Sequence, residues 1–249
     1  KITTIIKFGA DITGNIYIAQ KEGVNLVIDG VGFYFDGTIT VDGKNRNYGA
    51  ETLKITNIQF LTEDAEKTFI ALVDTYENVK ERYSHNVTIE GCSFYASSYN
   101  EKVGAINALT TYNLTVKNCS AQNLHSLLQA QSCNTTINIE DVTVNNCASG
   151  ISVGNTKVTN INKANINAKK YALRAEGTSD RTVDVTVSNS NFFAYAPITV
   201  RKVTTGSDVD LKLSNTTLNR TTEGLYDVVF QNNKDYEDGN VTPEVPTGK

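Results

Sequence analysis

The chain has 249 residues, a formal net charge of −4 at pH 7 and an isoelectric point near 5.3. This acidic balance argues against a protein that binds duplex nucleic acid, and no apolar run approaches the roughly 20 residues that a membrane-spanning helix needs. Thr and Asn together supply 59 residues. Because both are poor helix formers, while Thr favours strands and Asn favours turns, we expect an all-β protein.

An eight-residue pattern recurs along the chain and predicts the architecture. It reads apolar, any, apolar, any, turn residue, small or apolar, any, apolar, and successive copies start 22 to 34 residues apart. The copies span residues 26–33, 53–60, 87–94, 114–121, 137–144, 159–166, 185–192 and 211–218. Alternation with a period of two indicates a short strand with one buried face on each side of the turn residue.

The fifth position of each copy predicts a sharp bend. It is Gly, Asn or Asp in all copies but one, in the order Gly30, Asn57, Gly91, Asn118, Asp141, Lys163, Asn189 and Asn215. Because Gly, Asn and Asp tolerate a left-handed backbone best, each copy is expected to be a strand, a one-residue left-handed bend and a second strand.

A third strand is expected between successive copies. Its apolar segments span residues 16–18, 39–41, 70–73, 106–109, 127–130, 151–153, 172–175, 198–200 and 228–230. Three short strands in each repeat predict a right-handed parallel β-helix of about eight to nine coils. Since each coil is covered only by its neighbours, residues 1–234 form one domain, and 235–249 are expected to be a polar tail or linker. A β-sandwich would explain the short strands but not the recurring bend.

The eight copies resemble the right-handed parallel β-helix superfamily of pectate-lyase-like proteins, over about residues 2 to 232. More narrowly, residues 25–30 and 35–43 look like the opening coils of secreted bacterial surface proteins of this type. The resemblance implies an extracellular or cell-surface location. Because the chain starts directly in strand-like sequence, we expect its signal sequence to have been removed.

The cysteines are expected to be buried in the core. The four of them, Cys92, Cys119, Cys133 and Cys147, form no CxxC pair. In the expected register Cys92 and Cys119 occupy the same slot of adjacent coils, and Val142 and Ala164 follow in that slot. This arrangement predicts a ladder of thiols, although equivalent Cα atoms of adjacent coils also lie within reach of a disulfide.

Enzymes of this superfamily act on polysaccharides at the outer face of the third strand. Its outward positions here are expected to be Tyr17, Thr40, Ala71, Asn107, Gln129, Ser152, Arg174, Thr199 and Val229. The paired-Asp and Gly-His-Gly motifs of polygalacturonases are absent, so only Arg174, Glu176 and Arg201 remain as weak catalytic candidates. The alternative for these three is a solvated charge cluster. No cofactor or metal is expected, and calcium would be needed only by a lyase.

The longest coils carry tyrosine-rich insertions, which in repeat proteins often form a binding face. A tyrosine offers a flat apolar ring and a hydroxyl, which suits a sugar. The predicted ligand-binding residues are therefore Tyr76, Tyr83, Tyr95, Tyr99, Arg82 and His85. The alternative is that these tyrosines only pack their own loops against the rod.

Three functions remain open. The first is a non-catalytic extracellular or cell-surface module that binds a polysaccharide or glycan, or acts as an adhesin. The second is a polysaccharide lyase or glycoside hydrolase that acts on uronic-acid-containing polysaccharide. The third is a purely structural segment whose end coils contact other domains of a longer surface protein. None of them involves nucleic acid or a membrane span.

Overall fold

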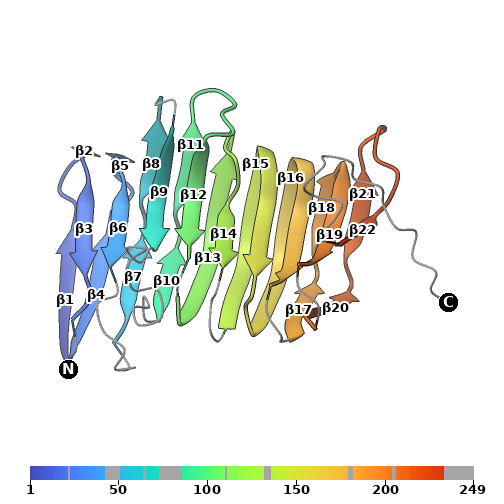
Figure 1. Ribbon diagram of the computed structural model, residues 1–249. Helices are drawn as coiled ribbons and strands as arrows, with labels where there is room; N and C mark the ends of the chain where they lie inside the picture. The colour runs from blue at the N-terminus through green and yellow to red at the C-terminus, as the bar shows by residue number, and fades with distance from the viewer. Residues whose placement is uncertain are drawn as a thin grey trace.

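The computed structural model describes residues 1–21, 23–42, 51–63, 66–72, 86–109, 111–131, 136–178, 182–203 and 206–232. In these ranges the regular structure is entirely β-strand, and every strand pairing is parallel (Figure 1). The strands wind into a rod with the N-terminal coil at one end and the last described coil at the other. The predicted all-β parallel β-helix is thus confirmed. No helix of the described residues is long and apolar enough to cross a membrane.

Three ladders of stacked strands form the sides of the rod. The first contains β1 (Ile2–Lys7), β4 (Val24–Asp29), β7 (Leu53–Thr56), β10 (Val87–Glu90), β13 (Asn113–Gln122), β15 (Thr136–Gly154), β16 (Val158–Gly177), β17 (Thr182–Ser188) and β20 (Asp208–Ser214). The second adds, to later parts of β13, β15 and β16, the strands β2 (Ile12–Thr13), β5 (Tyr34–Asp36), β8 (Gln59–Thr62), β11 (Ser93–Ala96), β18 (Asn191–Ala194) and β21 (Thr217–Arg220).

The third ladder adds, to the ends of β15 and β16, the strands β3 (Ile16–Ala19), β6 (Ile39–Asp42), β9 (Lys67–Leu72), β12 (Val103–Ala108), β14 (Leu128–Gln131), β19 (Ala196–Lys202) and β22 (Val228–Asn232). Over the described residues the rod has about seven turns, slightly fewer than the eight or nine coils expected. The predicted tail, 235–249, lies outside the described residues.

The left-handed bends occur where the repeat predicts them in every copy except the first. The φ angles at the other fifth positions lie between 45° at Asn215 and 63° at Gly91. In the first copy the bend falls instead on Val31 (φ 54°) and Gly32 (φ 84°), so the prediction for Gly30 is wrong. Position 30 needs a glycine for lack of space, because a Cβ there would lie 2.5 Å from the carbonyl oxygen of Asn57.

The core is a column of apolar side chains inside the coil. The ring centroids of Phe35 and Phe60 are 5.5 Å apart, and those of Phe60 and Phe94 are 4.9 Å apart. The thiols expected in the core are confirmed as free and buried at Cys92, Cys119 and Cys147, while Cys133 lies outside the described residues. Burial raises the pKa of the Cys147 thiol to about 11, so it is protonated and unreactive at neutral pH.

Asparagines stack on the outside of the rod and account for much of the unusual composition. The Asn189 amide donates to the Asn162 side-chain oxygen at 2.9 Å, and the Asn215 amide donates to that of Asn189 at 2.7 Å. Similar amide pairs one coil apart join Asn138 to Asn160, Asn145 to Asn167, Asn165 to Asn191 and Asn191 to Asn219. The Asn surplus therefore serves the ladders as well as the bends.

Candidate functional site

The third ladder carries the row of residues that the sequence predicts to point outward, although Ser152, Thr199 and Val229 of this row are buried. Strand pairing places the nine residues in one continuous row, in the order Tyr17, Thr40, Ala71, Asn107, Gln129, Ser152, Arg174, Thr199 and Val229. The chemistry of the side chains changes along this row. Amide and hydroxyl groups occupy its middle, and a charged cluster follows toward the C-terminal end.

The three catalytic candidates lie together in that cluster. A carboxylate oxygen of Glu176 lies 3.2 Å from Nη1 of Arg201 and 3.8 Å from Nε of Arg174. The same Nε atom of Arg174 donates to the hydroxyl of Ser152 at 3.2 Å. Glu176 is only 8% exposed, so its pairing with two guanidinium groups is weakly screened by solvent.

This geometry favours a structural ion cluster. Both arginines lie against the same carboxylate oxygen of Glu176, so this oxygen is engaged in ion pairs within the protein. Glycoside hydrolysis uses two carboxyl groups about 5 to 10 Å apart, and this cluster contains one. Among the described residues there is also no group of three or more His, Cys, Asp or Glu side chains that could hold a metal ion.

Replacing Glu176 by Gln is expected to lower the free energy of unfolding by about 1–3 kcal/mol, because the half-buried guanidinium groups of Arg174 and Arg201 each lose an ion pair with a buried carboxylate. Chemical denaturation measures the effect. Glu101→Gln is the matched control, since Glu101 pairs with Lys170 at 3.0 Å on an exposed surface and its loss is expected to leave the unfolding midpoint unchanged. Equal effects of the two substitutions would contradict this description of the cluster.

The predicted tyrosine surface is only partly described. Tyr76, Tyr83, Arg82 and His85 lie outside the described residues. Tyr95 projects from β11 on the second ladder and is 37% exposed. Tyr99 follows β11 and lies against the rod, with the ammonium nitrogen of Lys169 3.2 Å from its ring centroid. Tyr95 therefore presents its ring outward, whereas Tyr99 packs its own loop.

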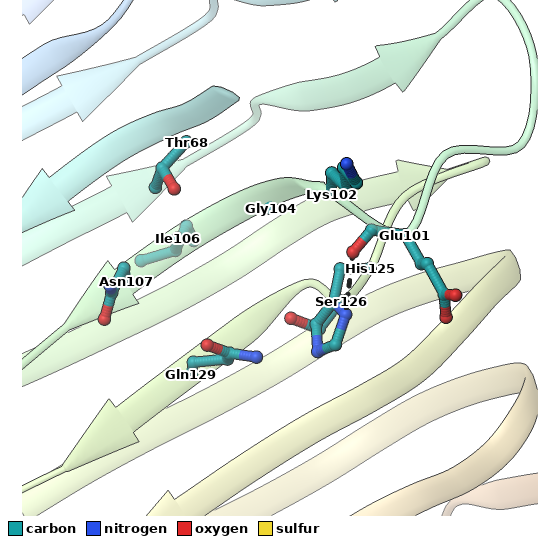
Figure 2. A pocket seen from close by; sticks show the side chains of 9 residues that line it. All are labelled: Thr68, Glu101, Lys102, Gly104, Ile106, Asn107, His125, Ser126 and Gln129. Carbon is teal, nitrogen blue, oxygen red and sulfur yellow. Dashed lines mark hydrogen bonds between the residues drawn. The ribbon is translucent and has the colours of Figure 1, made fainter. Parts of the chain in front are cut away.

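A pocket that the sequence did not reveal lies over β9, β12 and β14 of the third ladder (Figure 2). Its volume is about 250 Å³. The lining residues are Thr68, Glu101, Lys102, Gly104, Ile106, Asn107, His125, Ser126 and Gln129. Of these, Asn107 and Gln129 belong to the predicted outward row, where they are paired in adjacent coils.

The pocket is hollow because one position in it has no side chain. Gly104 is paired with Thr68 in the neighbouring coil. The nearest atom to a Cβ placed on Gly104 would be the Thr68 hydroxyl oxygen, at 3.8 Å. A glycine inside a strand often marks a place where another molecule approaches closely. The sequence signal was therefore the single Gly in Val-Gly-Ala-Ile, residues 103–106.

One wall of the pocket is formed by Glu101 and Lys102, which lie just before β12. The Glu101 carboxylate reaches Lys170, and the Glu101 carbonyl oxygen lies 3.0 Å from Nδ1 of His125. Because a carbonyl oxygen can only accept, Nδ1 carries the proton, and Nε2 is an acceptor in the neutral ring. Burial lowers the pKa of His125, which favours the neutral ring at neutral pH.

Two buried hydroxyl groups near the pocket have no hydrogen-bond partner among the described residues. They belong to Ser126, which lines the pocket, and to Ser149, and both residues are 1% exposed. Buried polar groups are almost always paired, so each exception needs an explanation. In Figure 2 the Ser126 hydroxyl lies on the side of the pocket that carries Gln129. A ligand hydroxyl in the pocket would give Ser126 the partner that it lacks.

No protein-family model, curated protein sequence or solved structure matches the chain. The function is therefore proposed from the residues on the outer sides of the second and third ladders.

Proposed function

We propose that the chain is a non-catalytic β-helix module of an extracellular or cell-surface protein, and that it binds a glycan. The observation that carries the proposal is the pocket of Figure 2, with its unpartnered Ser126 hydroxyl. The resemblance of the repeat to pectate-lyase-like proteins agrees with a saccharide ligand.

The chemistry of the lining suits a sugar ring. Each sugar hydroxyl both donates and accepts, and the pocket offers both roles through the amides of Asn107 and Gln129 and the hydroxyl of Ser126. Nε2 of neutral His125 adds an acceptor. The volume of 250 Å³ lies just below the about 300 Å³ at which pockets for drug-sized ligands begin, so it suits one ring at the end or branch of a glycan.

Two substitutions in the pocket test the proposal. Gly104→Val fills the hollow with a residue that favours strands, and Ser126→Ala removes the unpartnered hydroxyl. Each is expected to weaken binding at least about tenfold, which corresponds to about 1.4 kcal/mol, in a titration with the oligosaccharide that a glycan array identifies. Neither is expected to destabilise the fold, because Gly104 has open space and the Ser126 hydroxyl forms no bond.

The matched control is Gly154→Ala, which lies on the same ladder away from the pocket. The nearest atoms to its new Cβ are at 3.7 to 3.9 Å, in ordinary van der Waals contact. The Gly154→Ala variant is expected to bind the oligosaccharide as tightly as the unaltered chain. The proposal fails if the array shows no ligand, or if both pocket variants bind as well as the control.

The alternative is a lyase or hydrolase of uronic-acid-containing polysaccharide. One observation favours it, namely that Arg174, Glu176 and Arg201 come together on the third ladder. Release of unsaturated or reducing ends from such polysaccharides, with and without calcium, and its loss in Arg201→Gln, would support this activity instead.

A further inference from the structure

In the described strands of the second ladder, the two outward rows from β8 to β21 contain no charged residue, and Arg220 at the end of β21 lies in neither row. Strand pairing aligns these two rows along the ladder. One row contains Gln59, Ser93, Ser120, Thr143, Asn165, Asn191 and Thr217. The other contains Leu61, Tyr95, Gln122, Asn145, Asn167, Phe193 and Asn219. We call these two rows the uncharged face, and its strands follow one another along the rod in Figure 1.

Charged pairs lie on the other two ladders. Charged residues make up 20% of the chain. On the first ladder, Glu90 pairs with Lys54 at 2.5 Å and with Lys117 at 3.0 Å, and the third ladder carries the Glu176 cluster. An exposed protein surface normally mixes both signs of charge, which keeps it soluble and discourages association. A long uncharged stripe therefore indicates a surface that meets an uncharged partner.

The amides of the uncharged face are held in place by one another. Asn167 donates to Asn145 at 3.4 Å, Asn191 to Asn165 at 3.3 Å and Asn219 to Asn191 at 3.1 Å. Each of these asparagines is exposed, and one such bond uses only part of what an amide can donate and accept. The remaining amide groups are ordered before a partner arrives, which lowers the entropic cost of binding.

Exposed aromatic rings stand along the same face. Tyr95 and Phe193 are 37% and 38% exposed and lie in one row, four coils apart, which is about 19 Å at the usual strand spacing. Tyr34, 50% exposed, continues the other row at its N-terminal end. Tyr34 and Tyr95 also line a depression of about 290 Å³.

We infer that the uncharged face binds a linear neutral polysaccharide along the rod axis, with Tyr95 and Phe193 stacking on separate sugar rings and the amides between them bonding to hydroxyl groups. Uncharged amides pair with hydroxyls without the desolvation of a charge, and aromatic faces suit the CH surface of a sugar. The uncharged face shares no residue with the pocket of Figure 2. Its ligand is a polymer, whereas the pocket suits a single sugar ring.

The test is calorimetric titration of the full chain with soluble hexamers of β-1,4-linked glucose, mannose and N-acetylglucosamine, and with a polygalacturonate hexamer as the charged contrast. We expect at least one neutral hexamer to bind more tightly than polygalacturonate. Tyr95→Ala and Phe193→Ala are each expected to weaken that binding about three- to tenfold. Tyr195→Ala is the matched control, because Tyr195 is 47% exposed but lies outside both rows, and it is expected to bind normally.

Gly104→Val separates this inference from the proposed function, because it fills only the pocket on the third ladder. Binding that is lost in Gly104→Val but kept in Tyr95→Ala and Phe193→Ala would overturn the inference and leave the proposed function standing. The reverse pattern supports the inference and assigns binding to the uncharged face alone. Tighter binding of polygalacturonate than of any neutral hexamer overturns the inference, and no binding of any oligosaccharide overturns both.

Discussion

Phe60→Ala is expected to lower the free energy of unfolding by about 3–5 kcal/mol, the usual cost of removing a buried aromatic ring. Phe60 is 1% exposed, and its ring centroid lies 5.5 Å from Phe35, 5.5 Å from Phe69 and 4.9 Å from Phe94. The substitution therefore leaves a cavity between three successive coils. Because each coil is stabilised by its neighbours, the loss of packing also destabilises the neighbouring coils.

Equilibrium denaturation in guanidinium chloride measures this effect. Phe193→Ala is the control, since Phe193 is exposed on the second ladder and its loss is expected to change stability by no more than about 0.5 kcal/mol. If Phe60→Ala and Phe193→Ala shift the midpoint equally, then the column of phenylalanines does not stabilise the rod as described.

Gly150→Ala is expected to be the most damaging single methyl addition among the described glycines of β15. Its Cβ would lie 2.3 Å from the carbonyl oxygen of Ala172 and 2.7 Å from Cγ2 of Ile166 in the next coil. The carbonyl is backbone, so relief requires the coils to separate locally. Overpacking of this kind costs typically about 1–3 kcal/mol, and we expect a value at the upper end.

Gly154→Ala on the same strand is the matched comparison. Its Cβ has only ordinary contacts, and removing a glycine from a strand interior is expected to leave stability equal or raise it by up to about 1 kcal/mol. Thermal and chemical unfolding of both variants measures the difference. A Gly150→Ala variant as stable as Gly154→Ala would contradict the close approach of the two coils at Gly150.

The repeat could be predicted from the sequence because two local rules coincide in it. Alternating apolar residues mark the buried face, and Asn118, Asp141 or Asn189 marks the bend. Gly30 was misassigned because its need for space arises from Asn57 in the next coil, which no local pattern records. Further left-handed residues at Asn86, Asn123, Asn146 and Asn155 lie at corners that the eight-residue pattern does not include.

The binding surfaces were harder to foresee, since they depend on which coil lies beside which. The outward row through Asn107, Gln129 and Arg174 followed correctly from the alternation. The pocket beside it depends on Gly104 being level with Thr68 and on Glu101 reaching Lys170, three coils further along the rod. The uncharged face likewise becomes visible only after each outward residue is placed in its row.

Glycan binding in the pocket over β9, β12 and β14 can be located by chemical-shift mapping of the isotope-labelled full chain during titration with the array-selected oligosaccharide. The predicted result is a cluster of shifted signals from the backbone amides of Gly104 and Ser126 and from the side-chain amides of Asn107 and Gln129. Saturating binding that leaves these four signals unmoved would contradict binding in this pocket.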